Sequence, residues 1–492
     1  MVGRIIAIVA AIGALAGPAL PAAAEPVRPA LAEKRMLAEP SRLPSAAHTA
    51  PTSAPGERPG LGQPAATGAN APLPAQPVAG PTAATAAQPA AAPPKTALPE
   101  PVKVSNDPRP TLGPDTFVAT MNAADRYRAI VEAGGWPTVP NEATRLKPGE
   151  SGPAATLLRR RLAATGDLFE QEVARDAFDD ALAGALKRFQ TRHGLEETGL
   201  VGPRTLFHLN VPAAARLKAL QASAARLIGS KFPFGERYVA VNIPSATVEA
   251  VERGTVARRY VAVVGKPDRP SPTVETRLTS VNFNPTWTVP VSLIRKDIIP
   301  HVRKYPGYLA KMKIRLFDAT GAEVDPGMVD WSTERAVNYT IRQDAGIDNS
   351  LGEVRLDMPN RHAVYMHDTP SKRLFARNMR AQSSGCVRVS GVKELVGWLL
   401  DGMAGPDGAS SAWRQPEIDA AIASGKRQDV RLTKPVPVAW VYLTGYATAD
   451  GAVHFRDDVY NQDALSPAPA PGGPVKALTI DALVTSSIGA VR

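Results

Sequence analysis

The feature that most constrains this chain is the lack of aromatic residues in its first 116 positions. Of the 492 residues, the first aromatic one is Phe117, and the stretch from Glu25 to about Pro110 is dominated by Pro, Ala, Gly and Thr. Such a segment cannot bury enough apolar surface to offset the entropy lost on folding. We therefore expect residues 25–113 to be a disordered, extended Pro/Ala-rich linker. Residues 464–492 have a similar composition and predict a disordered tail.

The N-terminus has the pattern of an export signal. Arg4 precedes the apolar residues 5–15, and three alanines at 22–24 supply small residues for cleavage. Residues 1–24 are therefore predicted to be a signal peptide. The apolar run is short for a membrane span, but an uncleaved signal that tethers the protein to the inner membrane stays open as an alternative.

The rest of the chain predicts a multidomain α+β protein. About 350 residues remain, which is more than one ordinary core accommodates. Up to about residue 230 the pattern is helical; in residues 180–193, for example, the apolar positions follow helical spacing and Gly194 comes next. Farther along, the apolar residues alternate and turn residues separate the runs, which predicts a mostly antiparallel β-sandwich.

Strands are expected at seven places: residues 238–243, 247–251, 259–264, 362–367, 386–389, 429–432 and 436–443. The alternation lapses between Val291 and Ile347. A structureless loop of that length is uncommon inside a domain, so we expect an inserted subdomain or lid there.

The single cysteine, Cys386, is the best candidate for the chemistry. It cannot form a disulfide within the chain, and an idle exposed thiol is a liability in an oxidising compartment. A buried cysteine acting as a small apolar residue is the commoner alternative. Here, however, Ser383, Ser384 and Gly385 precede it and predict a tight turn, in which the N–H groups of Gly385 and Cys386 are placed to bind an oxyanion. The two serines either donate to substrate or only close the turn.

His367 has the best placement of the seven histidines to act as a base. It ends a predicted strand 19 residues before Cys386, so two neighbouring strand ends could bring imidazole and thiol together. A thiol of ordinary pKa is mostly protonated at neutral pH and benefits from an adjacent base. Alternation places Tyr365 on the face of His367 and Arg388 on the face of Cys386. Substrate contact is the functional interpretation of both; core packing and a structural ion pair are the alternatives.

These residues also carry a family resemblance. The stretch from His367 to Arg388 resembles the signature of YkuD-type L,D-transpeptidase domains, a histidine followed after about fifteen to twenty residues by Ser-His-Gly-Cys-Val-Arg. Further matching pieces occur in order: Gly265-Lys266-Pro267, Asn284-Pro285-Thr286-Trp287, Val289-Pro290 and Asn349-Ser350-Leu351-Gly352.

Two departures point to a subgroup. Asp368 and Ser384 stand where small members carry Gly and His, and the chain is similar to the larger, YcbB-like members at both positions. The resemblance implies a catalytic domain at residues 235–400 with a lid at about 291–347. The two departures leave open which group orients His367, and the candidates are the Asp368 carbonyl and the Asp368 carboxylate.

A second resemblance covers residues 152–211, which look like a peptidoglycan-binding three-helix module. On spacing alone, its apolar positions are the core of a small helical bundle. Residues 114–151 and 212–232 are expected to form a helical scaffold around it. Residues 401–463 are expected to add a helix and strands to the catalytic domain.

The net charge of +11 fits contact with acidic envelope polymers or a lipid surface, and equally an ordinary excess of arginine. The basic residues are dispersed, so we expect no nucleic-acid partner. The sequence shows no metal-ligand spacing and no phosphate loop, so we expect no metal and no cofactor.

The resemblance implies a periplasmic acyltransferase of a Gram-negative-type bacterium that acts in peptidoglycan biosynthesis, cell wall organisation and cell shape. Cys386 would attack a tetrapeptide stem and pass the acyl group to a second stem, which forms a 3-3 cross-link. Carbapenem-type β-lactams would inhibit it. Water as acceptor would give an L,D-carboxypeptidase, and a protein lysine would attach an outer-membrane protein to the wall. A wall-binding scaffold without catalysis is the alternative that retention of Cys386 and His367 disfavours.

Overall fold

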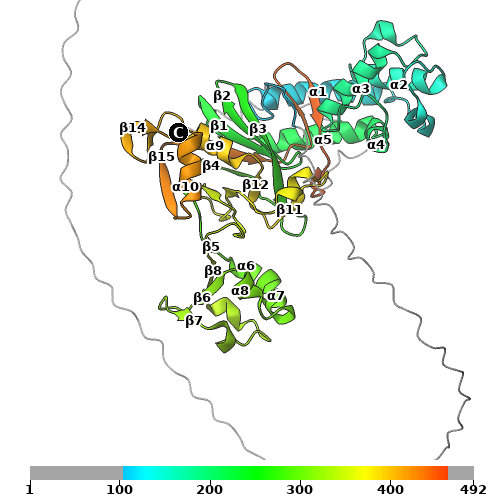
Figure 1. The fold of residues 1–492 in the computed structure, drawn as a ribbon. Coiled ribbons are helices and arrows are strands. Elements are labelled where there is room, and N and C mark those ends of the chain that lie inside the picture. The colour runs from blue at the N-terminus through cyan, green and yellow to red at the C-terminus, as the bar shows by residue number, and fades with distance from the viewer. Residues whose placement is uncertain (1–103, 464–492) are drawn as a thin grey trace, which may run out of the picture. The chain divides into compact units, whose positions relative to one another are not determined.

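The computed structural model describes residues 104–463, apart from the side chains of residues 409–411 (Figure 1). The predicted signal peptide, most of the predicted linker and the predicted C-terminal tail lie outside the described residues. Within residues 104–463, no helix combines the length and apolar character that crossing a membrane requires.

The first part of the described chain is helical. Its helices are α1 (Thr116–Glu132), α2 (Pro153–Ala163), α3 (Asp180–Arg192), α4 (Pro203–Leu209) and α5 (Ala213–Leu227), with short 3-10 turns at Asn141–Arg145 and Glu170–Glu172. Helix α3 begins where Asp179 accepts a hydrogen bond from the Leu182 N–H, and Gly194 follows it with φ +64°. Helices α2, α3 and α4 share a core of their own, which includes Leu158, Leu186 and Leu206.

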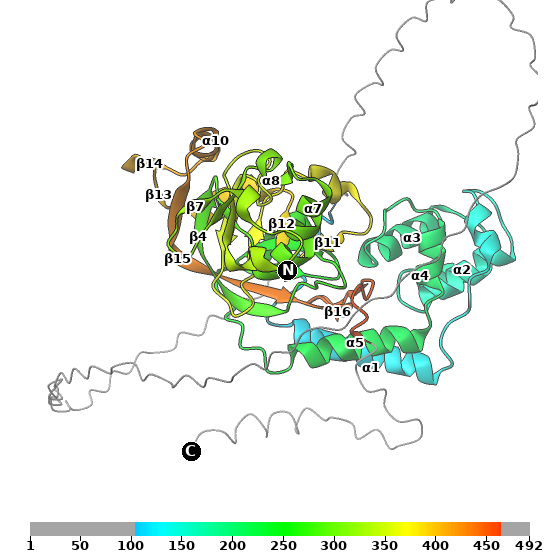
Figure 2. The same cartoon turned by 90° about the horizontal axis from the view of Figure 1, so that it is seen from below.

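Helices α1 and α5 lie side by side (Figure 2). Ala123 and Tyr127 of α1 pack with Leu220 of α5, and Phe455 from near the end of the described chain completes this cluster. The C-terminal residues therefore pack against the helical part as well as against the sheet.

The main sheet contains nine strands in the order β11-β3-β12-β10-β9-β4-β15-β1-β2. Their bounds are β1 (Arg237–Asn242), β2 (Thr247–Glu252), β3 (Thr255–Gly265), β4 (Val274–Phe283), β9 (Val354–Asp357), β10 (Met366–His367), β11 (Ala381–Ser383), β12 (Val387–Val389) and β15 (Gln428–Val441). Strand β2 also pairs with β3, so the sheet closes on itself. The pairs β1–β15, β10–β12 and β11–β3 are parallel, and the other pairs are antiparallel.

The predicted α+β class and the mostly antiparallel β layer are confirmed. The two late strands expected at 429–432 and 436–443 are instead one long strand, β15, whose register shifts between Arg431 and Val436. A bulge of this kind interrupts the alternation without ending the strand. Helices α9 (Val392–Leu400) and α10 (Gln415–Ala423) cover the sheet. Leu395 and Leu399 of α9 and Ile418 of α10 contribute to its core.

The remaining strands form small sheets. The pairs are β13 (Ala404–Gly405) with β14 (Gly408–Ala412), and β16 (Gly445–Ala447) with β17 (Val453–Phe455).

Residues 287–343 form what we call the inserted subdomain, which Figure 1 shows below the main sheet. It contains β5 (Trp287–Thr288), α6 (Val291–Leu293), a π turn at Ile294–Ile298, α7 (Ile299–Lys304), α8 (Tyr308–Lys311), β6 (Ile314–Phe317), β7 (Glu323–Val324) and β8 (Thr340–Gln343). The strands pair in the order β5-β8-β6-β7, and Ile294, Leu316 and Ile341 lie in a core separate from that of the main sheet. The interruption of alternation in the sequence therefore corresponds to a compact unit with its own core.

The predicted linker extends too far, because residues 104–113 are packed. Thr111 and Leu112 are buried, and the Val256 N–H donates to the Pro108 carbonyl at 2.8 Å. The N–H and the hydroxyl of Thr111 each donate at 2.8 Å to the buried carboxylate of Glu249. Composition missed this segment because hydrogen bonds, more than apolar burial, hold it in place.

The Glu249 carboxylate also receives the Arg259 Nε at 2.9 Å, and both side chains are almost fully buried. Removing one partner of a buried pair leaves an uncompensated charge. We predict that Glu249→Ala lowers the free energy of unfolding by about 3–5 kcal/mol. Glu236→Ala, which removes the exposed partner of Arg253, should leave the free energy of unfolding close to that of the wild type, because solvent screens such a pair. Urea denaturation followed by tryptophan fluorescence checks this, and equal losses in the two variants would contradict it.

Candidate active site

The candidate site is built on three short strands whose register aligns polar side chains on one face. In the parallel pair β10–β12, Met366 is opposite Val387 and His367 is opposite Arg388. In the antiparallel pair β10–β9, His367 is opposite Arg355. Residues in register point to the same face of a sheet. His367 is therefore flanked by two arginines, while Met366 and Val387 are fully buried on the other face.

Tyr365 and Cys386 lie on the same face of the sheet, each two residues before one member of the His367–Arg388 pair. The Val387 N–H donates to the Tyr365 carbonyl at 3.2 Å, which brings the two chains together at this point. Tyr365 lies two residues from His367, and Cys386 two residues from Arg388, so all four side chains share a face. The Tyr365 and His367 rings meet edge to face with centroids 5.7 Å apart. The two same-face pairs expected from the sequence thus come together as one group.

The turn before Cys386 is closed by Ser383. The buried Ser383 hydroxyl donates to the Cys386 carbonyl at 2.5 Å and accepts from the Gly385 N–H at 3.2 Å. Gly385 has φ +116°, a conformation that favours glycine. Of the two interpretations of Ser383, closing the turn is the one that these contacts fit.

The oxyanion donor expected at Gly385 is occupied, because its N–H already bonds to Ser383 Oγ. The Cys386 N–H has no hydrogen-bond partner among residues 104–463. In this conformation the Cys386 N–H is therefore the donor that an oxyanion could use, and the role expected for Gly385 stays a prediction.

Burial and charge keep both the Cys386 thiol and the His367 imidazole neutral at pH 7. Burial raises the pKa of the Cys386 thiol to about 11, against the opposing effect of hydrogen bonding with Tyr365 and of the Arg388 charge. Burial, and then the Arg388 charge, lowers the pKa of His367 to about 3. The described contacts include no hydrogen bond between the Cys386 thiol and the His367 ring.

The Asp368 carboxylate is engaged away from His367. It accepts from the Glu353 N–H at 3.1 Å and pairs with Lys372. A Cβ on Gly352 would lie 2.4 Å from Asp368 Oδ2, so a glycine is needed at this position. Among the described residues no hydrogen bond joins this carboxylate to the imidazole, and the alternative in which it orients His367 is therefore wrong.

The Asp368 backbone remains as the group that could orient His367. Together with the backbone of Leu351, it acts to raise the pKa of His367. The Nδ1 atom of His367 is nevertheless buried and has no hydrogen-bond partner in the described part of the chain.

Arg388 is a positive charge without an ion-pair partner in residues 104–463. Its Nε is buried and makes no hydrogen bond, and burial lowers its pKa. The alternative of a structural ion pair is therefore wrong. Arg355, in contrast, pairs with Asp357 at 2.8 Å and lies over the Tyr365 ring at 5.3 Å. Sequence reasoning missed Arg355, because an arginine in a short strand carries no distinctive pattern.

Ser384 is exposed and connects the turn to the inserted subdomain. Arg269 Nη1 donates to Ser384 Oγ at 3.2 Å, and the same guanidinium forms a two-pronged pair with Asp297 at 2.6 and 3.0 Å. Arg269 lies in the loop after β3, whereas Asp297 belongs to the π turn of the inserted subdomain. Sequence reasoning missed Arg269, since one charged residue in a Pro-containing loop gives no signal.

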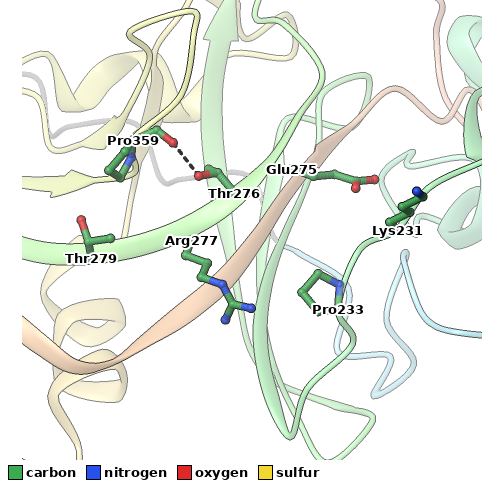
Figure 3. A pocket seen from close by; sticks show the side chains of 7 residues that line it. All are labelled: Lys231, Pro233, Glu275, Thr276, Arg277, Thr279 and Pro359. Atoms are coloured by element: carbon green, nitrogen blue, oxygen red, sulfur yellow. Dashed lines mark hydrogen bonds between the residues drawn. The ribbon is translucent and has the colours of Figure 1, made fainter. Parts of the chain in front are cut away.

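Two surface hollows lie on the described part of the chain. One, of about 450 Å³, contains no candidate site residue; its lining is Lys231, Pro233, Glu275, Thr276, Arg277, Thr279 and Pro359 (Figure 3). The other, of about 200 Å³, is lined by Asn282, Pro285, Thr286, Thr288, Arg355 and Arg427 and adjoins the site through Arg355. The described part of the chain contains no group of three or more His, Cys, Asp or Glu side chains that could hold a metal ion.

Comparisons with known proteins match two regions of the chain. Residues 236–406 match the YkuD family, described as "L,D-transpeptidase catalytic domain", and residues 151–209 match a family described as "Putative peptidoglycan binding domain". A Haemophilus influenzae protein described as "Putative L,D-transpeptidase" is 33% identical over 224 residues. That alignment covers 45% of this chain and 44% of the relative, so the chain spans less than half the length of this curated relative.

Solved structures of L,D-transpeptidases are more distant. One from Stackebrandtia nassauensis is 15% identical, with 52% of this chain and 89% of that chain covered and a TM-score of 0.23. One from Mycobacterium smegmatis is 15% identical, with 42% and 58% covered and a TM-score of 0.20. A structure described as LdtMt1 in complex with imipenem is 16% identical, with 42% and 59% covered and a TM-score of 0.19. TM-scores this low support no argument about function.

The raised pKa of Cys386 predicts a steep pH dependence of thiol alkylation. Because the thiol is protonated below about pH 11, the thiolate fraction should rise about tenfold per pH unit between pH 7 and 10. The pKa of His367, lowered to about 3, should add no inflection between pH 5 and 8. Iodoacetamide labelling of the single thiol measures this rate, and a constant rate from pH 5 to 8 would instead indicate a preformed thiolate–imidazolium pair.

Proposed function

We propose that this protein cross-links peptidoglycan through an acyl-enzyme on Cys386, since residues 236–406 match an L,D-transpeptidase catalytic domain and residues 151–209 match a family described as "Putative peptidoglycan binding domain". The observation that carries the proposal is the shared face of β10 and β12. It combines a nucleophile, a neutral base and an arginine without an ion-pair partner in the described chain. A binding scaffold would not require these three groups together.

The proposed first step is acylation by a tetrapeptide donor stem. His367 accepts the thiol proton, and the Cys386 thiolate attacks the carbonyl of the third stem residue. The new S–C bond forms as the C–N bond to the terminal D-alanine breaks, and His367 returns the proton to the leaving amine. The product is a thioester on Cys386.

The two arginines explain why this step would need substrate. An imidazolium at His367 is disfavoured by burial and by the positive charges of Arg355 and Arg388 on either side. A stem peptide carries carboxylates, and a carboxylate bound at Arg388 would neutralise part of this charge. Substrate binding would thereby raise the pKa of His367 and make proton transfer from Cys386 easier.

The Cys386 N–H is the donor that supports oxyanion binding in this proposal. A positioned oxyanion donor is typically worth about 3 kcal/mol in the transition state. The Ser383 hydrogen bonds hold the turn in the shape that exposes this N–H.

In the second step the side-chain amine of a neighbouring stem attacks the thioester, releases the thiol and leaves a cross-link between two third-position residues. Water as acceptor would give carboxypeptidase activity, and a protein lysine would give wall attachment. The peptidoglycan-binding domain supports a wall substrate. We further propose a periplasmic site of action, on the basis of the signal pattern at residues 1–24, and acylation of Cys386 by carbapenems.

The nucleophile and base assignments are tested by substitution. Cys386→Ala should abolish both cross-linking and the covalent carbapenem adduct, because the chain has no other thiol. His367→Ala should slow D-alanine release by about 10²–10⁴-fold, the usual contribution of a positioned base. His362→Ala, at an exposed histidine five positions earlier, is the matched control and should retain the wild-type rate. A carbapenem adduct on Cys386→Ala would refute the assignment of Cys386 as nucleophile. An unchanged rate of D-alanine release in His367→Ala would refute the assignment of His367 as base.

We also propose that the inserted subdomain acts as a lid over Cys386 and that the Arg269–Asp297 pair holds it in place. A closed lid excludes water and so favours the amine acceptor. Asp297→Ala should raise the ratio of hydrolysed to cross-linked product by up to about fivefold, as expected for the loss of a partly buried pair worth ~1 kcal/mol. Glu334→Ala removes the exposed pair with Arg295 in the same subdomain and should leave the ratio unchanged. Equal ratios in wild type and Asp297→Ala, measured by mass spectrometry of the products, would argue against the lid.

A further inference from the structure

A C-terminal segment beyond both family matches reaches the candidate active site. We define it as residues 453–463, which follow β16 and include β17. Its half-buried Tyr460 donates its hydroxyl to the Gly265 carbonyl at 2.6 Å and accepts from the Ser271 N–H at 3.1 Å. One hydroxyl therefore bridges both ends of the loop of residues 265–271, which we call the bracing loop.

The bracing loop holds the turn that carries the nucleophile. The buried Ser271 hydroxyl donates to the Gly385 carbonyl at 2.7 Å and accepts from the Gly265 N–H at 2.9 Å. The Lys266 N–H donates to the Ser383 carbonyl at 3.0 Å. The loop is tightly folded, since a Cβ on Gly265 would lie 2.3 Å from the Arg269 carbonyl oxygen.

The contact with the Gly385 carbonyl has a direct consequence for chemistry. The Gly385 carbonyl and the Cys386 N–H belong to the same peptide unit, which is planar and trans. In such a unit the C=O and the N–H point in opposite directions. When Ser271 fixes the carbonyl, it also fixes the direction of the N–H that the proposed reaction uses to bind the oxyanion.

Tyr460 is itself held in one orientation. Its ring stacks on Tyr442 with centroids 5.4 Å apart and an interplanar angle of 23°. Its N–H donates to the Tyr442 hydroxyl at 2.8 Å, and that hydroxyl donates to Asp458 at 2.5 Å. These contacts fix the phenol independently of the bracing loop.

The same segment is anchored on the peptidoglycan-binding domain. Arg192 donates to the Val453 carbonyl at 3.0 Å, and Arg456 donates to the Arg192 carbonyl at 2.8 Å. The Asp457 carboxylate forms an ion pair with the Arg204 guanidinium at 3.3 Å. Only a few residues separate these anchors from Tyr460, so the segment cannot shift far from the bracing loop.

We propose that Tyr460 is a positioning residue for acyl transfer: its hydroxyl holds the bracing loop, which in turn orients the Cys386 N–H toward the developing oxyanion. The inference rests on the proposed acyl-enzyme chemistry. It assigns a role at the candidate active site to a residue that lies outside residues 236–406. Tyr460 does not touch the substrate in this scheme and acts through Ser271 and Gly385.

Two reactions of the Cys386 thiol can distinguish a loss of oxyanion positioning from a general disruption of the site. Acylation by a carbapenem passes through a tetrahedral oxyanion, whereas alkylation by iodoacetamide is a direct displacement without one. Tyr460→Phe keeps the stacked ring and removes only the hydroxyl. We expect it to slow carbapenem acylation of the full chain by about tenfold or more, as small misplacements of catalytic groups can do, with the alkylation rate unchanged.

Ser271→Ala should show the same selective loss, because it removes the hydrogen bond to the Gly385 carbonyl directly. Tyr305→Phe, at an exposed tyrosine of the inserted subdomain, is the control and should behave as wild type. Wild-type acylation by Tyr460→Phe, or an equal fall in acylation and alkylation, would overturn the inference. Both outcomes differ from a failure of the proposed function, in which Cys386→Ala would still acquire the adduct.

Discussion

The candidate site depends on the register between three short strands, β9, β10 and β12. Because His367 is paired with Arg355 on one side and Arg388 on the other, the strands put these side chains on the face that Cys386 shares. A shift of one residue would turn His367 into the core and bring Met366 out. The full burial of Met366 and Val387 on the opposite face is what opposes such a shift. Apolar packing on the opposite face of the sheet thus maintains the geometry of the candidate site.

The same burial sets the protonation of the site. A thiol whose pKa is raised and an imidazole whose pKa is lowered both stay neutral at pH 7, so the resting protein has little thiolate. A reactive thiolate exposed to an oxidising compartment would be prone to oxidation. In the proposed mechanism the anionic substrate supplies the charge that shifts this balance. Reactivity would then appear mainly when a stem peptide is bound.

Sequence patterns predicted the parts of this protein that depend on periodicity. Strands β1 and β2 were indicated by runs of apolar residues and prove to be buried on both faces. Helix α3 shows its apolar stripe and its capping residue. Cys386 and His367 could be singled out because a lone thiol and a histidine at a strand end are unusual. Arg355, Arg269 and Tyr460 could not be found in this way. Each is an ordinary polar residue whose importance comes from a partner far away in the sequence.

Two differences between the sequence-based expectations and the structure have the same physical origin. Residues 104–113 look like linker by composition, yet the Glu249 carboxylate and neighbouring backbone groups bind them. Gly385 was expected to offer its N–H to substrate, yet Ser383 already accepts that hydrogen bond. Hydrogen bonds to backbone groups leave no trace in the hydrophobic pattern of a sequence, so they become visible only in the folded structure.

The acyl-enzyme on Cys386 is the central claim, and trapping it is the most direct test. The purified protein would be mixed with a tetrapeptide donor in the absence of an amine acceptor, quenched in acid and analysed by intact-protein and peptide mass spectrometry. The account predicts a mass increase equal to the donor minus D-alanine, located on the peptide that contains Cys386. An unmodified protein that nevertheless releases D-alanine, or an adduct on a peptide without Cys386, would contradict it.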